Sequence, residues 1–208
     1  MTLEREASAE SRQPACPATL TGVHVQLKPL SLDQHDGLVA AVEDGDLWTL
    51  WYTSVPTPGG MRAEISRRLA LQAAGSMAPF CVVDRQTGRI VGMTNFLNID
   101  AGGPRLEIGS TWYARAVQRT PLNTEAKLLL LTRAFEELDC LAVELRTHVL
   151  NQQSRRAIER LGAKLDGVLR CHRRAEDGTL RDTCVYSITA SEWPAVRSHL
   201  TWQLTRPR

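Results

Sequence analysis

The sequence has little net charge, few aromatic residues and no long apolar run. Its 208 residues carry a formal net charge of +2, and only 5% of them are Phe, Trp or Tyr. Proteins dedicated to nucleic acids depend on a strong positive balance, so this charge argues against a nucleic-acid partner. No apolar stretch approaches the ~20 residues that cross a bilayer, so no membrane-spanning segment is expected.

Cysteine is also scarce. The five cysteines are odd in number and include no CxxC pair, which argues against a disulfide framework or a zinc site. We therefore expect a cytoplasmic protein without a metal. Residues 1–18 lack the apolar core of a signal peptide and are expected to form a flexible leader. One domain should follow over residues 19–208, since 43% hydrophobic and 23% charged residues are typical of a globular chain.

The middle of the chain predicts a strand, a sharp loop and a helix. Residues 106–113 (LEIGSTWY) are β-prone and predict the strand. Thr120 and Pro121 suit the cap and first turn of a helix that continues through TEAKLLLLTRAFEEL with one buried stripe. The helix start, beside Arg119 and within reach of Lys127, offers free N–H groups and a positive dipole end, which attract phosphate. Alternatively, it is an ordinary amphipathic helix that binds no anion.

A second strand and helix follow directly. Polar and apolar side chains alternate over residues 141–148, which predicts a period-two strand. Asn151 then precedes a short helix that Gly162 ends. Taken alone, an asparagine in this position is an ordinary N-cap.

The flanking regions predict compatible elements. We expect a strand over 23–30, a helix from 31–33 through 42, an aromatic segment over 44–60, a helix over 61–74, a hairpin over 80–97 and a terminal helix from 192–194 to about 204.

The runs EIGSTWYARAVQRTPLNTEAKLLLLTRAFEEL, NQQSRRAIERLGAKLDGVLR and DGTLRDTCVYSI followed by EWP cover about half the chain. They resemble the GCN5-related N-acetyltransferases (GNAT), specifically the branch of ribosomal-protein N-terminal acetyltransferases. The resemblance implies an α/β fold with a central mixed, mostly antiparallel sheet that splays open beside residues 106–113 and is flanked by helices. The cofactor core would span about 106–190 and the C-terminal helix about 191–204.

The resemblance also implies acetyl-CoA as co-substrate. Pantetheine would bond to the backbone around Trp112 and Tyr113, Asn151 would face the pantetheine arm or the acyl group, and Ser154 would lie near the sulfur. The pyrophosphate would sit on the loop over 118–124, whose expected contacts are Gln118, Arg119, Thr120, Asn123 and Thr124.

The chain departs from the family in this loop. Where glycines are usual it has Arg119, Pro121 and Asn123, and Pro121 lacks an N–H donor. Binding would then rely on fewer amides, on Arg119 and on the helix dipole. Two basic clusters could hold the 3′-phosphate or steer an anionic partner, although charged faces are usually just solvated: Arg155, Arg156 and Arg160, and Arg170, Arg173 and Arg174.

The implied reaction is direct attack of a neutral amine on the thioester, which needs a base. Glu107 is the expected base; alternatively it forms a strand-end pair with an arginine such as Arg105. Ile158 stands where many members carry a tyrosine acid, so Ser154 or water is the expected proton donor. Alternatively, Ser154 is a first-turn serine bound to solvent or backbone. Thiolate is a fair leaving group, so a weak acid suffices.

The acceptor is expected to be a primary amine on a protein N-terminus or a small molecule. Trp48, Trp51 and Tyr52, in a lid over 44–60, would line its site; alternatively these aromatics only pack. Asp182 would orient a cationic acceptor, or else close a turn after Asp177 and Gly178. Two other functions stay open: transfer from another acyl-CoA such as succinyl-CoA, and a non-catalytic acyl-CoA-binding module. A homodimer through strand or tail pairing is compatible with the sequence.

Overall fold

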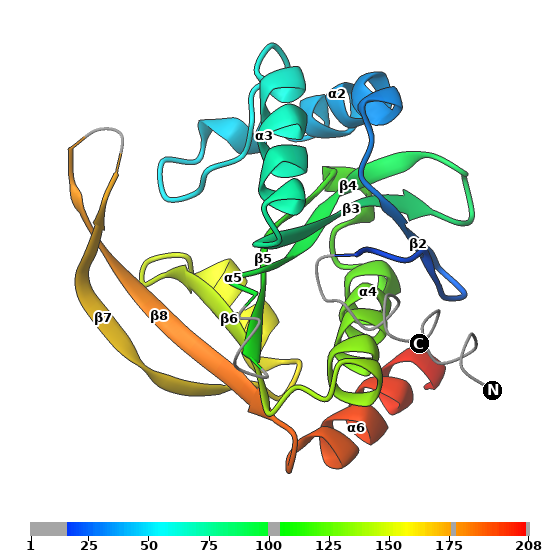
Figure 1. The fold of residues 1–208 in the computed structure, drawn as a ribbon, viewed down its shortest axis with the longest axis vertical. Coiled ribbons are helices and arrows are strands. Elements are labelled where there is room, and N and C mark those ends of the chain that lie inside the picture. Colours follow the sequence, from blue (N-terminus) through cyan, green and yellow to red (C-terminus); the bar gives the residue numbers. More distant parts are fainter. Residues whose placement is uncertain (1–15, 100–104, 176–177, 207–208) are drawn as a thin grey trace.

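The computed structural model describes residues 16–99, 105–175 and 178–206. The expected leader over residues 1–18 therefore lies almost wholly outside the described residues. Eight strands form one sheet in the order β1-β2-β3-β4-β5-β6-β8-β7 (Figure 1). The strands are β1 (Leu20–Thr21), β2 (Val25–Pro29), β3 (Met77–Asp84), β4 (Ile90–Leu97), β5 (Arg105–Tyr113), β6 (Ala142–His148), β7 (Lys164–Arg174) and β8 (Leu180–Thr189).

Helices cover both faces of this sheet. They are α2 (His35–Glu43), α3 (Met61–Ala73), α4 (Pro121–Thr132), α5 (Gln152–Glu159) and α6 (Trp193–Thr205), with short helical turns at Leu32–Gln34, Leu47–Thr49, Arg115–Val117 and Arg133–Glu137. Thr94 and Asn95 are neighbours on β4, so their side chains point to opposite faces. Lys127 of α4 bonds to Thr94, whereas Arg68 of α3 bonds to Asn95. The two helices therefore lie on opposite faces of the sheet (Figure 1).

The sheet splits between β5 and β6. Every other neighbouring pair is antiparallel, but these two strands are parallel and pair only at Arg105↔Ala142, Leu106↔Val143 and Glu107↔Glu144. Beyond Glu107, β5 stays with β4 and β6 stays with β8. The expected mixed, mostly antiparallel and splayed sheet is confirmed.

Most of the expected elements are present with small shifts at their ends. The helix α4 begins at Pro121, and the Thr120 hydroxyl accepts a hydrogen bond from the N–H of Leu122 at 3.4 Å, as its cap. The expected continuous helix instead changes at Thr132 into one π-helical turn over Arg133–Glu137. The first strand is shorter than predicted, and the two-residue strand β1 was not predicted at all.

The N-terminal hairpin is tied to α4 by one buried carboxylate. Glu125 is 6% exposed and accepts hydrogen bonds from the backbone N–H groups of Val23, His24 and Val25 at 2.8, 2.6 and 2.9 Å. Three backbone donors satisfy a buried carboxylate that would otherwise be costly. The pairing of β1 with β2 therefore depends on a side chain about 100 residues away.

The C-terminal helix is anchored by its first tryptophan. The Trp193 indole stacks on Phe135 with ring centroids 5.3 Å apart, and its Nε1 donates to Glu136 Oε1 at 2.9 Å. Trp193 is 6% exposed. The predicted packing of this tail on the domain is confirmed. In the part of the chain that the structure describes, no helix has the length and apolar character needed to cross a membrane.

Candidate functional site

Glu107 lies where the sheet splits. It is the last residue of β5 that pairs with β6, and it is 8% exposed. A Cβ atom on Gly109 would lie 2.7 Å from Glu107 Oε1, so only glycine at this position lets the carboxylate run along the strand. Asn98 Nδ2 donates to Glu107 Oε2 at 2.7 Å, and Arg146 Nε lies 3.6 Å from the same oxygen.

The surroundings of Glu107 make it a stronger base than an ordinary carboxylate. Burial raises the pKa of Glu107, while Arg146 and the hydrogen bond from Asn98 lower it by less, so the net shift is upward. The alternative pairing with Arg105 is wrong, because Arg105 Nη2 bonds to Glu144 Oε1 at 2.9 Å. Glu144 also binds Arg146 at 2.7 Å, which leaves Glu107 only a distant ion pair.

A bulge in β5 follows Glu107 by three residues. The pairing of β4 with β5 shifts between Met93 and Asn95, and Ser110 has a positive φ of 46°. Asn95 Nδ2 donates to the Gly109 carbonyl at 2.9 Å, and Arg68 Nη1 donates to Asn95 Oδ1 at 2.9 Å. Arg68 is 1% exposed and also bonds to Glu64 at 2.7 Å. The helix α3 thus holds the bulge through a buried arginine.

The loop before α4 keeps a conformation that glycine favours although it has none. Arg119 has φ 62°, in the left-handed region. Thr120 Oγ1 donates to the Val117 carbonyl at 2.7 Å, and Gln118 Nε2 donates to the Tyr113 carbonyl at 3.1 Å. The loop is therefore closed by its own side chains, and the substitution of arginine for glycine has not opened it.

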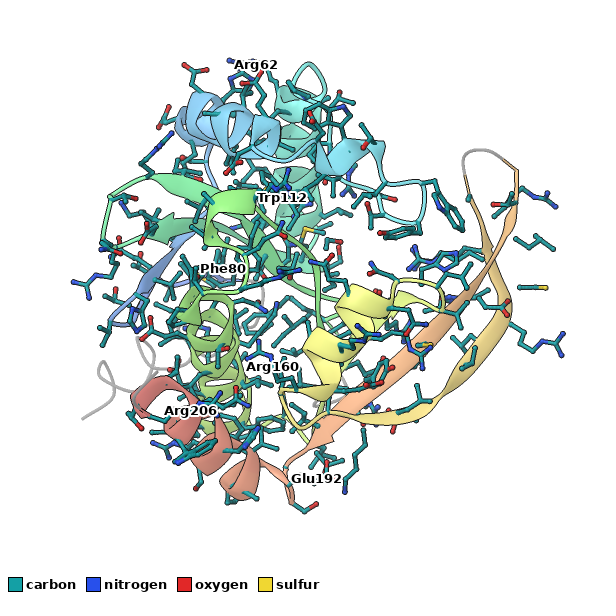
Figure 2. The ribbon with its side chains drawn as sticks, turned by 180° about the vertical axis from the view of Figure 1, so that it is seen from behind. Arg62, Phe80, Trp112, Arg160, Glu192 and Arg206 are labelled. Atoms are coloured by element: carbon teal, nitrogen blue, oxygen red, sulfur yellow. The ribbon has the colours of Figure 1, made fainter. Side chains whose placement is uncertain are left out.

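The start of α4 has a cation that the sequence did not identify there and lacks one that it predicted. Arg160 of α5 donates to Thr124 Oγ1 at 3.0 Å, so its guanidinium lies beside the first turn of α4 (Figure 2). Lys127 was expected within reach of the phosphate; this is wrong. Its side chain turns to the sheet, 5% exposed, and Nζ donates to Thr111 at 2.9 Å and to Thr94 at 3.2 Å.

These residues fit a nucleotide phosphate and a pantetheine arm. Arg119 and Arg160 bring two positive charges to the N-terminus of α4, whose dipole is also positive. Three enclosed polar atoms nearby make no hydrogen bond within the described residues: Trp112 Nε1, Tyr113 Oη and Asn123 Oδ1. Buried polar atoms without partners are rare in folded proteins, and a ligand is one way to satisfy them. Burial also raises the pKa of the Tyr113 phenol.

Asn151 and Ser154 stand together at the start of α5. The Asn151 side-chain oxygen accepts a hydrogen bond from the Ser154 N–H at 3.0 Å, so Asn151 is the N-cap of this helix. Neither Asn151 Nδ2 nor Ser154 Oγ has a hydrogen bond within the described residues, and both side chains are half-buried. Ile158 is buried at the position of the usual tyrosine. The capping role and a ligand role for Asn151 are therefore compatible, because they use different atoms.

The lid reaches across to the far side of the split. Trp51 is 57% exposed, and its ring meets His148, at the end of β6, edge-on with centroids 5.3 Å apart. Tyr52 lies 5.6 Å from Trp51, whereas Trp48 is half-buried against the core. At its other end the lid is tied to the loop after β5, where Asp44 Oδ2 accepts from the Ala116 N–H at 2.9 Å. Trp51 and Tyr52 thus face the split more than Trp48 does.

Asp182 has a structural contact that the sequence did not predict. Its Oδ1 accepts a hydrogen bond from the Cys171 N–H at 2.7 Å across the hairpin. Cys171 has φ 51°, in a bulge of β7. The suggested turn closure beside Gly178 is therefore not its contact, and Asp177 lies outside the described residues. One carboxylate oxygen of Asp182 holds the bulge, and the other is left for an acceptor.

A comparison with known families decides the family. The Acetyltransferase (GNAT) domain family matches residues 24–164. The chain belongs to the GNAT acetyltransferases. The resemblance to this family that the sequence motifs indicated is confirmed, and the match spans the split, the bulge and the phosphate loop.

Relatives agree with this membership. A Bacillus subtilis (strain 168) protein named "Putative ribosomal N-acetyltransferase YdaF" is 33% identical over 111 residues, which are 51% of this chain and 57% of that protein. The match thus spans less than two thirds of that relative. Its name supports the ribosomal acetyltransferase branch that the motifs resemble.

Solved structures of GNAT proteins share the fold. A GCN5-related N-acetyltransferase from Brucella melitensis superposes with a TM-score of 0.81 at 29% identity, covering 89% of this chain and 85% of that one. An acetyltransferase from T. thermophilus gives 0.79 at 31% identity, covering 91% and 98%. Mycobacterium smegmatis RimJ, solved with CoA-disulfide, gives 0.78 over 92% and 97% of the chains, and at 19% identity it shows the fold alone.

Proposed function

We propose that this GNAT acetyltransferase moves an acetyl group from acetyl-CoA to a primary amine, on a protein N-terminus or a small molecule. The observation that carries the proposal is the buried Glu107 carboxylate at the split between β5 and β6. Its pKa is raised by burial, and a base with a raised pKa is suited to take a proton from an ammonium group near neutral pH. No covalent enzyme intermediate is needed.

The chain's own groups have separate roles in this reaction. Glu107 takes the proton from the amine, directly or through water, and the amine nitrogen then attacks the thioester carbonyl carbon. As the carbon–sulfur bond breaks, the thiolate receives a proton from Ser154 or from water. The Arg68–Asn95 contact positions the bulge in β5 beside which the acyl group would lie. Trp51 and Tyr52 form the acceptor side with Trp48 behind them, and Asp182 orients the amine.

The co-substrate would be held at three places. The backbone of Trp112 and Tyr113 would pair with the pantetheine, and Asn151 Nδ2 would meet its amide or the acyl oxygen. The pyrophosphate would lie on the loop from Gln118 to Thr124, with Arg119 and Arg160 supplying charge. Because acetyl-CoA supplies the thioester, no metal is required for this chemistry. We also infer a cytoplasmic protein and propose a homodimer formed through the free edge of β7 or the tail.

Calorimetry with acetyl-CoA, followed by thiol release with a panel of amines and N-terminal peptides, tests the proposal. Glu107→Gln should bind acetyl-CoA like the wild type and lose thiol release by about 10²-fold or more, the usual contribution of a general base. Glu43→Gln, an exposed glutamate with no contact to the site, is the matched control. Normal release from Glu107→Gln would rule out this residue as the base.

Two alternatives have distinct outcomes in the same experiment. Tight binding of acetyl-CoA without release for any amine would favour a non-catalytic acyl-CoA-binding module. Faster release from succinyl-CoA than from acetyl-CoA, with the same amine, would favour another acyl donor.

A further inference from the structure

One half of the sheet face that carries Glu107 is rich in arginine. Residues directly opposite each other in neighbouring strands share a face, and the pairs Glu107↔Glu144 and His148↔Thr183 carry this face from β5 across β6 to β8. Arg181 lies two residues before Thr183 on β8, and therefore on the same face. Its partner on β7 is Arg173. The face is the one toward α3, and the Trp51–His148 contact links the lid to it.

Arg173 and Arg181 are short of negative charge. Within the described residues neither makes an ion pair or a side-chain hydrogen bond, whereas Arg146 on the same face is bound by Glu144. Arg181 Nε is enclosed and has no hydrogen-bond partner. A guanidinium with an enclosed, unpaired N–H is unfavourable unless an acceptor fills the place. This pair is therefore a different case from a solvated surface arginine.

The two arginines lie within electrostatic range of Glu107. The charge of Arg173 lowers the pKa of Glu107, and the Glu107 carboxylate raises the pKa of Arg181, against the larger effect of burial and the charge of Arg173, which lower it. The two ends of this face thus differ in sign: a buried carboxylate at the split and an arginine pair toward the β7–β8 hairpin. An acceptor that carries both an amine and an anion would be oriented by this difference.

We propose that the acceptor carries a carboxylate, which Arg181 binds with help from Arg173 while the acceptor's amine lies against Glu107. The inference rests on the proposed function and names its substrate class. A planar guanidinium matches a carboxylate with two parallel hydrogen bonds. The carboxylate belongs to an acidic side chain in the first residues of a peptide or to a small amino acid. Trp51 and His148 form the wall of the site on the lid side.

The test compares acceptors that differ only in this group. kcat/KM is measured at saturating acetyl-CoA for short peptides that share their N-terminal residue and have Glu or Gln next to it, and for a small amino acid and its amide. The wild type should prefer each carboxylate by about tenfold or more, the effect of one hydrogen bond to a charged group. Arg181→Gln should lose that preference and keep its rate with the neutral acceptors. Which pair shows the larger preference identifies the source of the carboxylate.

Two further variants keep the result interpretable. Arg62→Gln removes one charge from the exposed start of α3, at the far end of the molecule (Figure 2), and should keep the preference. Arg181→Glu should reverse it toward peptides with Lys after the first residue, which a misfolded variant would not do. Equal rates for acidic and neutral acceptors in the wild type, or a preference that survives in Arg181→Gln, would overturn the inference while leaving the transferase in place.

Failure of the proposed function has its own signature. If no acceptor releases thiol, binding of the same peptides is followed by tryptophan fluorescence. Binding of the acidic peptide that Arg181→Gln abolishes would support the carboxylate site without the reaction, and absence of such binding would overturn both. An Arg181-dependent gain for succinyl-CoA with neutral amines would assign the arginines to the acyl donor and overturn the acceptor assignment.

Discussion

Asn98 Nδ2 donates a 2.7 Å hydrogen bond to Glu107 Oε2, the carboxylate oxygen that also faces Arg146. Asn98 has φ 49°, a left-handed conformation that asparagine tolerates. The hydrogen bond opposes the effect of burial, since it lowers the pKa of Glu107. One residue at the end of β4 therefore sets how basic the proposed catalytic carboxylate is.

Replacing Asn98 by glycine should raise the pKa of Glu107 further without straining the backbone. The group that must be deprotonated would then remain protonated to higher pH, so the acidic limb of the kcat/KM profile should move upward. The measurement is the pH dependence of thiol release. Asn98→Asp should shift the limb in the same direction, and Asp139→Gly, at an exposed left-handed position, should not. An unchanged limb in Asn98→Gly would contradict this role.

Lys127 should make stability depend on pH. Burial lowers its pKa from 10.5 to about 7, so between these values the unfolded chain binds more protons than the folded one. Stability should therefore rise with pH through this window, and the lysine should be most unfavourable where it is charged, below about 7. Lys127→Met should remove this part of the pH dependence and stabilise the fold at low pH.

The difference in unfolding free energy between variant and wild type, from urea titrations at about pH 6 to pH 9, measures this effect. Lys28→Met, on the exposed side of β2, is the control and should give a flat difference. A flat difference for Lys127→Met as well would show that the amine is not desolvated in solution.

Glu125→Gln should weaken the N-terminal hairpin. An amide has one acceptor oxygen and would turn its NH₂ group toward the three backbone donors of Val23, His24 and Val25. We expect a loss of about 2–3 kcal/mol, because buried donors are left unpaired, together with faster hydrogen exchange over residues 20–29. Glu43→Gln should change stability by less than about 0.5 kcal/mol. Equal stability of the two variants would contradict the proposed tie.

Arg119→Gly should separate stability from affinity. Glycine relieves the left-handed strain at φ 62°, and the gain in unfolding free energy should be about 0.5–1 kcal/mol after the entropy that glycine adds to the unfolded chain. The loss of one exposed cation should weaken acetyl-CoA binding by about two- to fivefold. Arg115→Gly, where φ is not positive, should instead destabilise the protein by about 0.5–1 kcal/mol. Destabilisation by both changes would argue against strain at Arg119.

Sequence patterns predicted the local elements of the site well and its long-range contacts poorly. Thr120 and Asn151 were correctly placed as caps, since a cap bonds to residues two or three positions along the chain. Arg68 had no such signal, because its partner Asn95 is 27 residues away on another element. Glu107 was chosen from the family resemblance, and its expected partner Arg105 proved to belong to Glu144.

Lys127 shows why the helix stripe misled. The apolar spacing of α4 marked one buried face, and a lysine outside that stripe was expected near the phosphate. The helix packs between the sheet and α6 (Figure 1), so two of its faces are covered and polar residues between them are buried as well. How many faces of a helix are covered depends on its neighbours, which the periodicity of its own residues does not encode.

The sequence by itself determined which segments become strands and helices, where α4 and α5 begin, and the family to which the chain belongs. These depend on backbone preferences, caps and motifs that act over a few residues. Only the tertiary structure decided that Glu107 is buried against Asn98, that Arg160 stands at the start of α4, and that Arg173 and Arg181 face the split without a carboxylate. Burial and Coulomb interactions depend on distances in space, and the sheet brings these residues together from five separate elements.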